Sequence, residues 1–215
     1  KTAMTLDGKI ACESGESKYM SSHESLKKVH QLRSVVDGIL VGVNTLINDD
    51  PLLTIRHIKR PKLATQPKAI ILDSNAKTPL NSSIFKTNRN KEEIIIIMDS
   101  KKASKKKVEQ LRKKATIINV RSKNNQLDWH EIIHQLFNHS IHHLLIEGGS
   151  KVITSAIESG VIDKINISIV PKLMVNQKAI PILAGSLTHK ISDLIQIRDI
   201  HYEQCGQDLW AIGYL

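Results

Sequence analysis

Three polar, glycine-containing segments each follow an apolar stretch, and their residue types could bind or transform a small molecule. They are residues 5–17, 41–51 and 147–150. Asp7-Gly8 and Ser14-Gly15 are turn dipeptides, since glycine takes positive φ freely and an Asp or Ser side chain can hydrogen-bond its own backbone. α/β folds place their chemistry on loops at strand ends. We therefore expect the three segments to line one cleft of backbone and short polar groups.

The third segment, Glu147-Gly148-Gly149-Ser150, stands between an expected strand and an expected helix. Backbone N–H groups at a helix start can hold a phosphate, and glycine lets the ligand approach closely. Two adjacent glycines also fit an ordinary tight turn. The segment is not the GxGxxG fingerprint of dinucleotide-binding folds, so that rule gives no prediction.

In the second segment, Thr45 and Asp49 lie one helical turn apart after an expected strand. Thr45 can donate and accept hydrogen bonds, and Asp49 can hold a hydroxyl or an amide. Arg33 and Arg56 flank the same region, and a guanidinium fork suits a sugar phosphate. The same residues also fit a capped short helix that ends before Pro51 and two surface arginines.

A possible metal motif lies at residues 130–134, His-Glu-Ile-Ile-His, which matches the HExxH pattern of zinc proteases. The extended form of that motif needs Gly at 137 and His at 140, where this chain has Phe137 and Ser140. Ile132 and Leu136 supply the buried stripe of an ordinary helix. We expect no metal site. The sequence also contains no zinc-deaminase, serine-hydrolase or Walker motif.

The composition narrows the class of partner. The net charge is +10, but lysines 101, 102 and 105–107 and the basic residues 112–114 belong to a helical pattern with Val108 and Leu111, which predicts a solvated face. Aromatic residues make up only 3% of the chain, and no nucleic-acid-binding motif is present. We expect a phosphorylated small-molecule ligand and no nucleic acid. A basic nucleic-acid-binding protein and a zinc hydrolase stay as alternatives of a different class.

Apolar run length, cysteine spacing and apolar content indicate where the protein resides and what forms its core. No apolar run approaches the ~20 residues that span a bilayer, so we expect no membrane contact. Cys12 and Cys205 are far apart in the sequence, which favours free thiols in a reducing cytosol and a cytoplasmic protein. With 40% apolar residues and few aromatics, the core must be aliphatic.

Alternating periodicities predict the elements that position these segments. Expected strands are 3–4, 38–43, 68–72, 93–98, 116–120, 143–146, 164–170, 195–201 and 209–215, and expected helices are 22–35, 104–114, 128–137 and one that runs to 159. In the first helix Ser22 is the expected N-cap, and Leu26, Val29 and Leu32 form the expected apolar stripe. The pattern predicts a single α/β domain, 1–215, with a mainly parallel sheet covered on both faces and an antiparallel C-terminal edge hairpin.

Six stretches carry a family resemblance: MTLDGKIA (4–11), SGESKYMS (14–21), VHQLRSVVDGILVGVNTLINDDPLLTIR (29–56), IILDS (70–74), LLIEGGS (144–150) and IVPKLM (169–174). In this order they closely resemble the riboflavin-biosynthesis reductases, over essentially the whole chain. The resemblance implies a dihydrofolate reductase-like three-layer fold, a homodimer and NADPH as cofactor. It also implies reduction of a ribosylaminopyrimidinone 5′-phosphate to its ribitylamino form, by hydride transfer to C1′ of a ring-opened Schiff base.

Because the chain shows no deaminase motif, it resembles the archaeal and fungal type, which reduces the 2,5-diamino compound. The alternatives are the deaminated 5-amino-6-ribosylaminouracil 5′-phosphate and another pterin or pyrimidine as substrate. The missing motif also predicts that no deaminase domain lies in this chain, and we expect the first strand to be cut short at Lys1.

The resemblance places cofactor and substrate residue by residue. It puts NADPH near Ala3, Tyr19, Thr45, Asp49, Ser74, Gly148, Gly149, Ser150, Lys151 and Val152, with Lys77 near the 2′-phosphate, and the substrate near Ser17, Arg33, Leu53, Arg56 and Glu147. Asp49 or Glu147 would protonate or position the opening sugar. Two positions depart from the family pattern. Ser150 replaces a third glycine, and Val175-Asn176-Gln177 replaces a usual Gly-Gly, which leaves the shape of that loop open.

Overall fold

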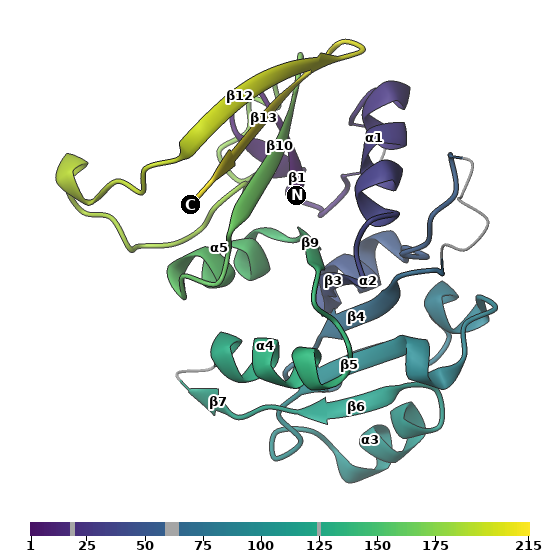
Figure 1. Cartoon of the computed structure of the whole chain (residues 1–215). Helices are drawn as coiled ribbons and strands as arrows, with labels where there is room; N and C mark the ends of the chain where they lie inside the picture. Colours follow the sequence, from purple (N-terminus) through teal and green to yellow (C-terminus); the bar gives the residue numbers. More distant parts are fainter. Residues whose placement is uncertain (18–19, 59–64, 124–125) are drawn as a thin grey trace. The chain divides into compact units, whose positions relative to one another are not determined.

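A computed structural model describes residues 1–17, 20–58, 65–123 and 126–215. The chain forms two compact units, which can be followed by colour in Figure 1. We call residues 29–147 the central unit, and residues 1–28 together with 148–215 the terminal unit. The expectation of a single domain over residues 1–215 stays a prediction.

The central unit is built on a five-stranded sheet in the order β6-β5-β4-β3-β9. Its strands are β3 (Gly38–Gly42), β4 (Lys68–Leu72), β5 (Ile94–Met98), β6 (Thr116–Asn119) and β9 (Leu144–Gly148). The strands from β3 to β6 run parallel. β9 starts beside β3, since the His143 carbonyl accepts hydrogen bonds from the Asp37 and Gly38 N–H groups. The carboxyl ends of the strands therefore share one edge.

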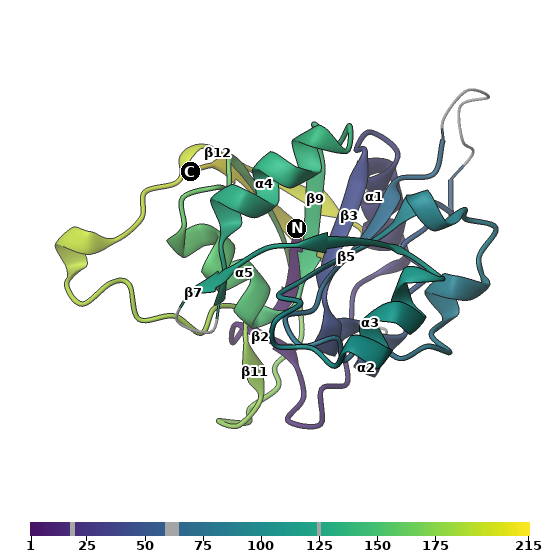
Figure 2. The same cartoon turned by 90° about the horizontal axis from the view of Figure 1, so that it is seen from below.

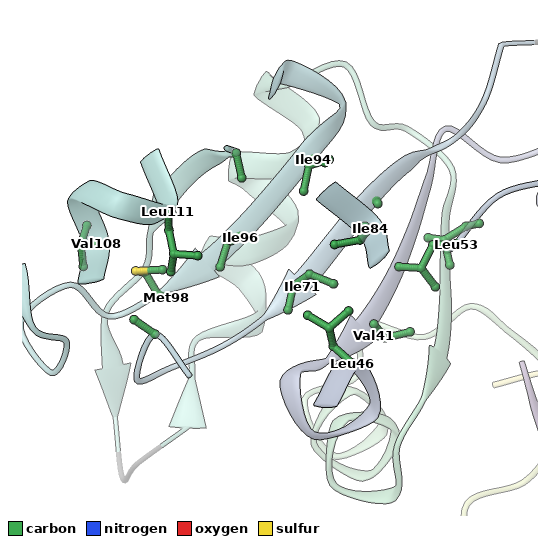
Figure 3. Close-up of a cluster of buried hydrophobic side chains, with 14 residues drawn as sticks. Val41, Leu46, Leu53, Ile71, Ile84, Ile94, Ile96, Met98, Val108 and Leu111 are labelled. Atoms are coloured by element: carbon green, nitrogen blue, oxygen red, sulfur yellow. The ribbon is translucent and has the colours of Figure 1, made fainter. Parts of the chain in front are cut away.

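Helices cover both faces of this sheet. Figure 2 shows α2 (Val43–Asp49) and α3 (Lys105–Arg112) on one side of β3 and β5, and α4 (Trp129–Asn138) on the other. On the α2 and α3 side, Ile71 and Ile96 from the sheet belong to one buried cluster with Leu46 and Leu111 from the helices (Figure 3). This packing follows from the alternation of strand side chains between two faces. The expected aliphatic core is confirmed.

Short elements complete the central unit. They are the 3₁₀ turns η1 (Ser83–Lys86) and η2 (Lys91–Glu93) and the small hairpin of β7 (Ser122–Lys123) and β8 (Gln126–Leu127). On α3, Val108 and Leu111 are buried while Lys105 and Lys106 are exposed, so the expected solvated lysine face is confirmed. Within the described parts of the chain, no helix is both long and apolar enough to cross a bilayer.

The terminal unit is built on a four-stranded sheet in the order β1-β10-β13-β12. Its strands are β1 (Thr2–Thr5), β10 (Lys164–Val170), β12 (Arg198–Cys205) and β13 (Asp208–Tyr214). The remaining elements are the short strands β2 (Lys9–Ala11) and β11 (Ile180–Pro181), the turn η3 (Ile191–Asp193) and helix α5 (Ser150–Glu158). β1 runs parallel to β10, whereas the two later strands run antiparallel.

The predicted α/β class is confirmed, and two details differ. The expected mainly parallel sheet is present as two sheets, and the C-terminal hairpin is the edge of the smaller one. The expected strand at 195–201 starts at Arg198 and continues to Cys205, up to the turn at Gly206 with its φ of 62°. Periodicity predicts that a strand exists, but its ends depend on the partner strand, here β13.

Helix α1 (His23–Arg33) begins as predicted but buries a different face. Ser22 is the N-cap, since its Oγ accepts a hydrogen bond of 3.2 Å from the Ser25 N–H. Leu26 is 40% exposed, so its expected place in the buried stripe is wrong. The buried side chains are Val29 and three polar ones, Ser25, His30 and Arg33. They can be buried because each has a hydrogen-bond partner, such as Trp210 Nε1, which donates to Ser25 Oγ.

The first polar loop forms the turn that Asp7-Gly8 predicts. The Gly8 N–H donates to the Thr5 carbonyl, and Gly8 has a φ of 74°. Asp7 accepts hydrogen bonds from the Thr5 hydroxyl and from the backbone N–H groups of Met174 and Val175. In that order, these bonds lower the pKa of Asp7 to about 2, because they stabilise the carboxylate form. Asp7 thus sets the shape of the loop that departs from the family pattern.

We predict that Val175→Gly raises the free energy of unfolding by about 1 kcal/mol. Val175 has a φ of 48°, which costs a β-branched residue about 1–2 kcal/mol, and its side chain is 82% exposed, so little packing is lost. Glycine's extra freedom in the unfolded chain offsets part of this gain. Urea denaturation measures the change. The control is Val35→Gly. Val35 is exposed as well but does not have a positive φ, so glycine there should not stabilise the protein.

Candidate functional site

Arg33 and Glu147 form a nearly buried ion pair in the central unit. Arg33 Nε lies 2.7 Å from Glu147 Oε1 and Arg33 Nη2 lies 2.6 Å from Glu147 Oε2, with both side chains 10% exposed. This is the two-bond arrangement in which a guanidinium and a carboxylate bind most strongly. The sequence predicted both as substrate residues, and the structure joins them across 114 positions. Glu147 lies near the carboxyl end of β9.

The segment that follows α2 is held by side chains instead of a strand ladder. Arg33 Nη1 donates to the Thr54 carbonyl at 2.9 Å. The Gln66 amide accepts from the Ile55 N–H at 2.8 Å and donates to the Ile55 carbonyl at 3.4 Å. The Arg56 N–H donates to His30 Nδ1 at 3.1 Å. The backbone of residues 54–56 is thereby fixed. Arg56, the last of the three, is exposed.

His30 is a site residue that the sequence reasoning missed. It is buried, and its ring packs edge-on against His57 with ring centroids 4.7 Å apart. Burial, and then the nearby charge of Arg33, lowers the pKa of His30 to about 4. Because Nδ1 accepts a hydrogen bond, the neutral ring carries its proton on Nε2. The sequence signal that could have identified His30 is its position three residues before Arg33, on the same face of the helix.

Arg89 was also missed. Its guanidinium donates to the carbonyls of Leu52 at 2.6 Å and Pro67 at 3.1 Å, and also to the Leu53 carbonyl. Partial burial lowers the pKa of Arg89 to about 10. Leu53 itself is buried with a φ of 50°, a conformation that a leucine keeps only when its surroundings enforce it. Arg89 thus holds Leu53 in place, and no local sequence pattern predicts this contact.

Helix α2 carries Thr45 and Asp49, both half-buried, at the edge where β3 ends. The helix ends before Pro51 as expected, with Asp50 in the left-handed conformation at a φ of 42°. Asp50 accepts hydrogen bonds from the Ser83 N–H and hydroxyl, which ties the helix end to η1. A short capped helix is therefore confirmed. Cofactor binding by Thr45 and Asp49 stays a prediction.

The loop after β4 is organised by Asp73. This buried carboxylate accepts hydrogen bonds from the backbone N–H groups of Lys77 and Thr78 and from the Thr78 hydroxyl, at 2.7–2.9 Å. The turn leaves Ser74 half-buried and Lys77 exposed. Since Gly42 pairs with Leu72, the ends of β3 and β4 are adjacent. Thr45, Ser74 and Glu147 therefore lie at one edge of the parallel sheet, the usual position for ligand binding in open α/β sheets.

In the terminal unit, helix α5 starts at Ser150, with Gly149 as N-cap and Gly148 at a φ of 150°, which strongly favours glycine. Ser150 is 6% exposed, and its Oγ is buried without a hydrogen-bond partner among the described residues. A buried hydroxyl of this kind is costly unless a ligand or water completes it. Lys151 is exposed and Val152 half-buried in the same first turn. The start of α5 therefore suits an anionic group.

The other expected ligand residues of the terminal unit give less information. Ala3 lies in β1 and pairs with Ser168 of β10. Ser17 is half-buried, and Tyr19 lies outside the described residues. The three polar segments fall in different units, so their expected meeting in one cleft stays a prediction.

The HExxH segment forms the expected amphipathic helix α4. Ile132 and Leu136 are buried, while His130 and His134 are exposed. Glu131 accepts a hydrogen bond from the Arg121 N–H at 3.2 Å. Among the residues that the structure describes, no group of three or more His, Cys, Asp or Glu could hold a metal ion.

The fold and these residues can be compared with known proteins. A family profile described as "RibD C-terminal domain" matches residues 1–211. The chain belongs to this family. The resemblance to riboflavin-biosynthesis reductases is thereby confirmed, and with it the class of enzyme, an oxidoreductase.

Two curated relatives of the RibD C-terminal domain family illustrate its range. The chain is 36% identical over 209 residues to the riboflavin biosynthesis protein RibD of Aquifex aeolicus, covering 97% of this chain and 55% of that protein. It is 32% identical over 207 residues to the 2,5-diamino-6-ribosylamino-4(3H)-pyrimidinone 5′-phosphate reductase of Methanothermobacter thermautotrophicus, covering 96% of this chain and 92% of that protein. The chain thus spans about half of the first relative and nearly all of the second.

Solved structures show the same fold. RibD of Acinetobacter baumannii superposes with a TM-score of 0.81 at 20% identity, over 99% of this chain and 57% of that one. Dihydrofolate reductase of Enterococcus faecalis superposes with a TM-score of 0.50 at 10% identity, over 99% of this chain and 92% of that one. The dihydrofolate reductase-like fold predicted for this RibD C-terminal domain is therefore confirmed.

Proposed function

We propose that the chain reduces 2,5-diamino-6-ribosylamino-4(3H)-pyrimidinone 5′-phosphate to its ribitylamino product with NADPH, in the cytoplasm. The observation that carries this proposal is the similarity over 92% of the Methanothermobacter reductase of that name. A second candidate, supported by the 36% identity to a bacterial RibD, is the deaminated 5-amino-6-ribosylaminouracil 5′-phosphate.

Each of the two units offers groups that suit a nicotinamide dinucleotide. The unsatisfied Ser150 hydroxyl and the glycines before it suit a pyrophosphate at the start of α5. In the central unit, taken by itself, Thr45 and Ser74 at the sheet edge suit polar groups of a cofactor, and the exposed Lys77 suits a 2′-phosphate as a point charge. When bound, NADPH supplies the hydride. The protein contributes binding and orientation.

One of the two candidate acid residues, Glu147, is already bound by an arginine. Both Glu147 oxygens accept hydrogen bonds from Arg33, and a paired carboxylate acts as an acceptor only. In our proposal Glu147 therefore orients polar groups of the substrate, while Asp49 on α2 supplies the proton as the sugar ring opens to the Schiff base. Asp49→Asn should then lower kcat and change KM much less. If Asp49→Asn and Glu147→Gln both keep a near-normal kcat, neither residue is the acid.

Arg33 and Arg56 also separate in role. The Arg33 guanidinium is already bound by Glu147 and Thr54, so it is poorly placed to bind a phosphate as well. Arg56 is exposed and mounted on a fixed backbone. We therefore propose Arg56 as the phosphate contact and Arg33 as the group that orients Glu147.

The decisive measurement is NADPH oxidation, followed by absorbance, with the diamino compound and its deaminated analogue side by side. We expect turnover with a higher kcat/KM for the diamino compound, and a higher kcat/KM with NADPH than with NADH. Preference for the deaminated compound would select the second candidate. If neither compound is turned over, the proposed activity is wrong.

We further propose that the protein is a homodimer formed through the segment that leads into β12. This segment exposes large apolar side chains, including Ile191 at 88% and Leu194 at 54%, and β12 itself exposes Tyr202 at 63%. An apolar surface of this kind marks an interaction site, and β12 is also an edge strand that can pair with another chain.

Light scattering after size-exclusion chromatography tests the dimer. We expect twice the chain mass for the wild type and a single chain mass for Ile191→Ser/Leu194→Ser. Val35→Ser, which replaces an apolar residue that is 71% exposed in the central unit, is the control and should stay dimeric. A monomeric wild type at tens of micromolar concentration would refute the proposal.

A further inference from the structure

Side chains from other segments hold the backbone that leads to Arg56. Residues 54–56 belong to no strand, yet backbone groups of all three are bound by side chains. Two of these side chains, His30 and Arg33, come from the same face of α1, three residues apart. A rigid backbone below an exposed cation is what a preorganised anion contact requires, since less conformational freedom is lost on binding.

His30 supplies the hydrogen bond that holds the Arg56 N–H. Its Nδ1 accepts the Arg56 N–H, the last of the fixed backbone groups before the chain turns at Ile58, whose N–H donates to the Arg56 carbonyl. The ring is 3% exposed and is held edge-on by His57. Its orientation is therefore set by packing as well as by the hydrogen bond.

We propose that His30 is a positioning residue for substrate binding: through Nδ1 it fixes the Arg56 backbone so that the Arg56 guanidinium is presented to the substrate phosphate. This inference rests on the proposed function for the nature of the phosphate ligand. His30 touches no reacting atom in this role. It acts on substrate affinity and leaves the chemical step unchanged.

The substitutions His30→Asn and His30→Leu separate positioning from packing. The Asn side-chain oxygen lies near the position of Nδ1 and can still accept from the Arg56 N–H, whereas Leu fills a similar volume without an acceptor. We expect His30→Leu to raise KM for the phosphorylated substrate about tenfold with kcat within a factor of two. His30→Asn should stay within about threefold of the wild-type KM. Thermal unfolding verifies that both variants are folded.

A double-mutant cycle with Arg56→Ala makes the assignment specific. Once Arg56 has lost its guanidinium, adding His30→Leu should not raise KM further. The proposal would be overturned if His30→Leu raised KM equally in the wild type and in Arg56→Ala. It would also be overturned if His30→Asn raised KM as much as His30→Leu.

Calorimetric titration with inorganic phosphate gives a readout that does not depend on turnover. We expect His30→Leu and Arg56→Ala to weaken phosphate binding to a similar extent and His30→Asn to preserve it. If the wild type turns over neither pyrimidine but shows this pattern, the proposed reaction is wrong and the role of His30 stands. If phosphate binding is unaffected by His30→Leu, or is absent in the wild type, the role of His30 is wrong.

Discussion

Glu147→Gln should lower the free energy of unfolding by about 3 kcal/mol. The Arg33–Glu147 pair is 10% exposed on each side, and removing one partner leaves a nearly buried charge without compensation. Urea denaturation at neutral pH measures the loss. The double variant Arg33→Met/Glu147→Leu should recover most of it, because an apolar pair of similar volume is often as stable as a buried ion pair.

The chain offers a matched control for this prediction. Glu13 forms an exposed pair with Lys178, at 3.6 Å and with side chains 56% and 76% exposed. Such pairs contribute at most about 1 kcal/mol, so Glu13→Gln should have little effect. A loss for Glu147→Gln no larger than that for Glu13→Gln would contradict the prediction. Turnover distinguishes stability from function, since the double variant should be stable yet inactive.

The second large effect is a fall in stability as the pH drops from 6.5 to 4. The pKa of His30 is about 4 in the folded protein, against an ordinary value of 6.5. Between these values the unfolded chain binds a proton that the folded protein does not, so stability decreases with decreasing pH. The full effect is at most about 3 kcal/mol. Burial is the main cause, with Arg33, His57 and Arg56 adding to it and Glu147 opposing it.

Urea denaturation at several pH values tests this effect, with His30→Asn as the comparison. The variant should lose the slope between pH 6.5 and pH 4, whatever its stability at pH 7. Three carboxylates, Asp7, Asp37 and Asp99, also have lowered pKa values but titrate at lower pH. Their contribution is lost as the pH falls through and below their ordinary value of 3.8, whereas the loss caused by His30 begins near pH 6.5. An unchanged slope in His30→Asn would show that another group is responsible.

Features that depend on local pattern were predicted well. The strand at 68–72 and the cap at Ser22 agree with the structure, as does the turn at Gly8. Each follows from residues close together in the chain: a run of apolar side chains, a hydroxyl before a helix, a glycine that accepts positive φ. The segments that identified the family are also local.

Features that depend on distant partners could not be predicted in this way. Periodicity expected Leu26 in the buried stripe of α1, but the helix buries Ser25, His30 and Arg33 because each finds a polar partner elsewhere in the chain. Burial of a polar side chain is favourable only when such a partner is in place.

By itself, then, the sequence determined the α/β alternation, the polar strand ends and the family to which they belong. Only the tertiary structure decided that Arg33 binds Glu147 and that His30 holds Arg56. The physical reason is the difference in range. Backbone preferences and turn chemistry act between neighbours, whereas an ion pair between residues 114 positions apart forms only when packing brings them together.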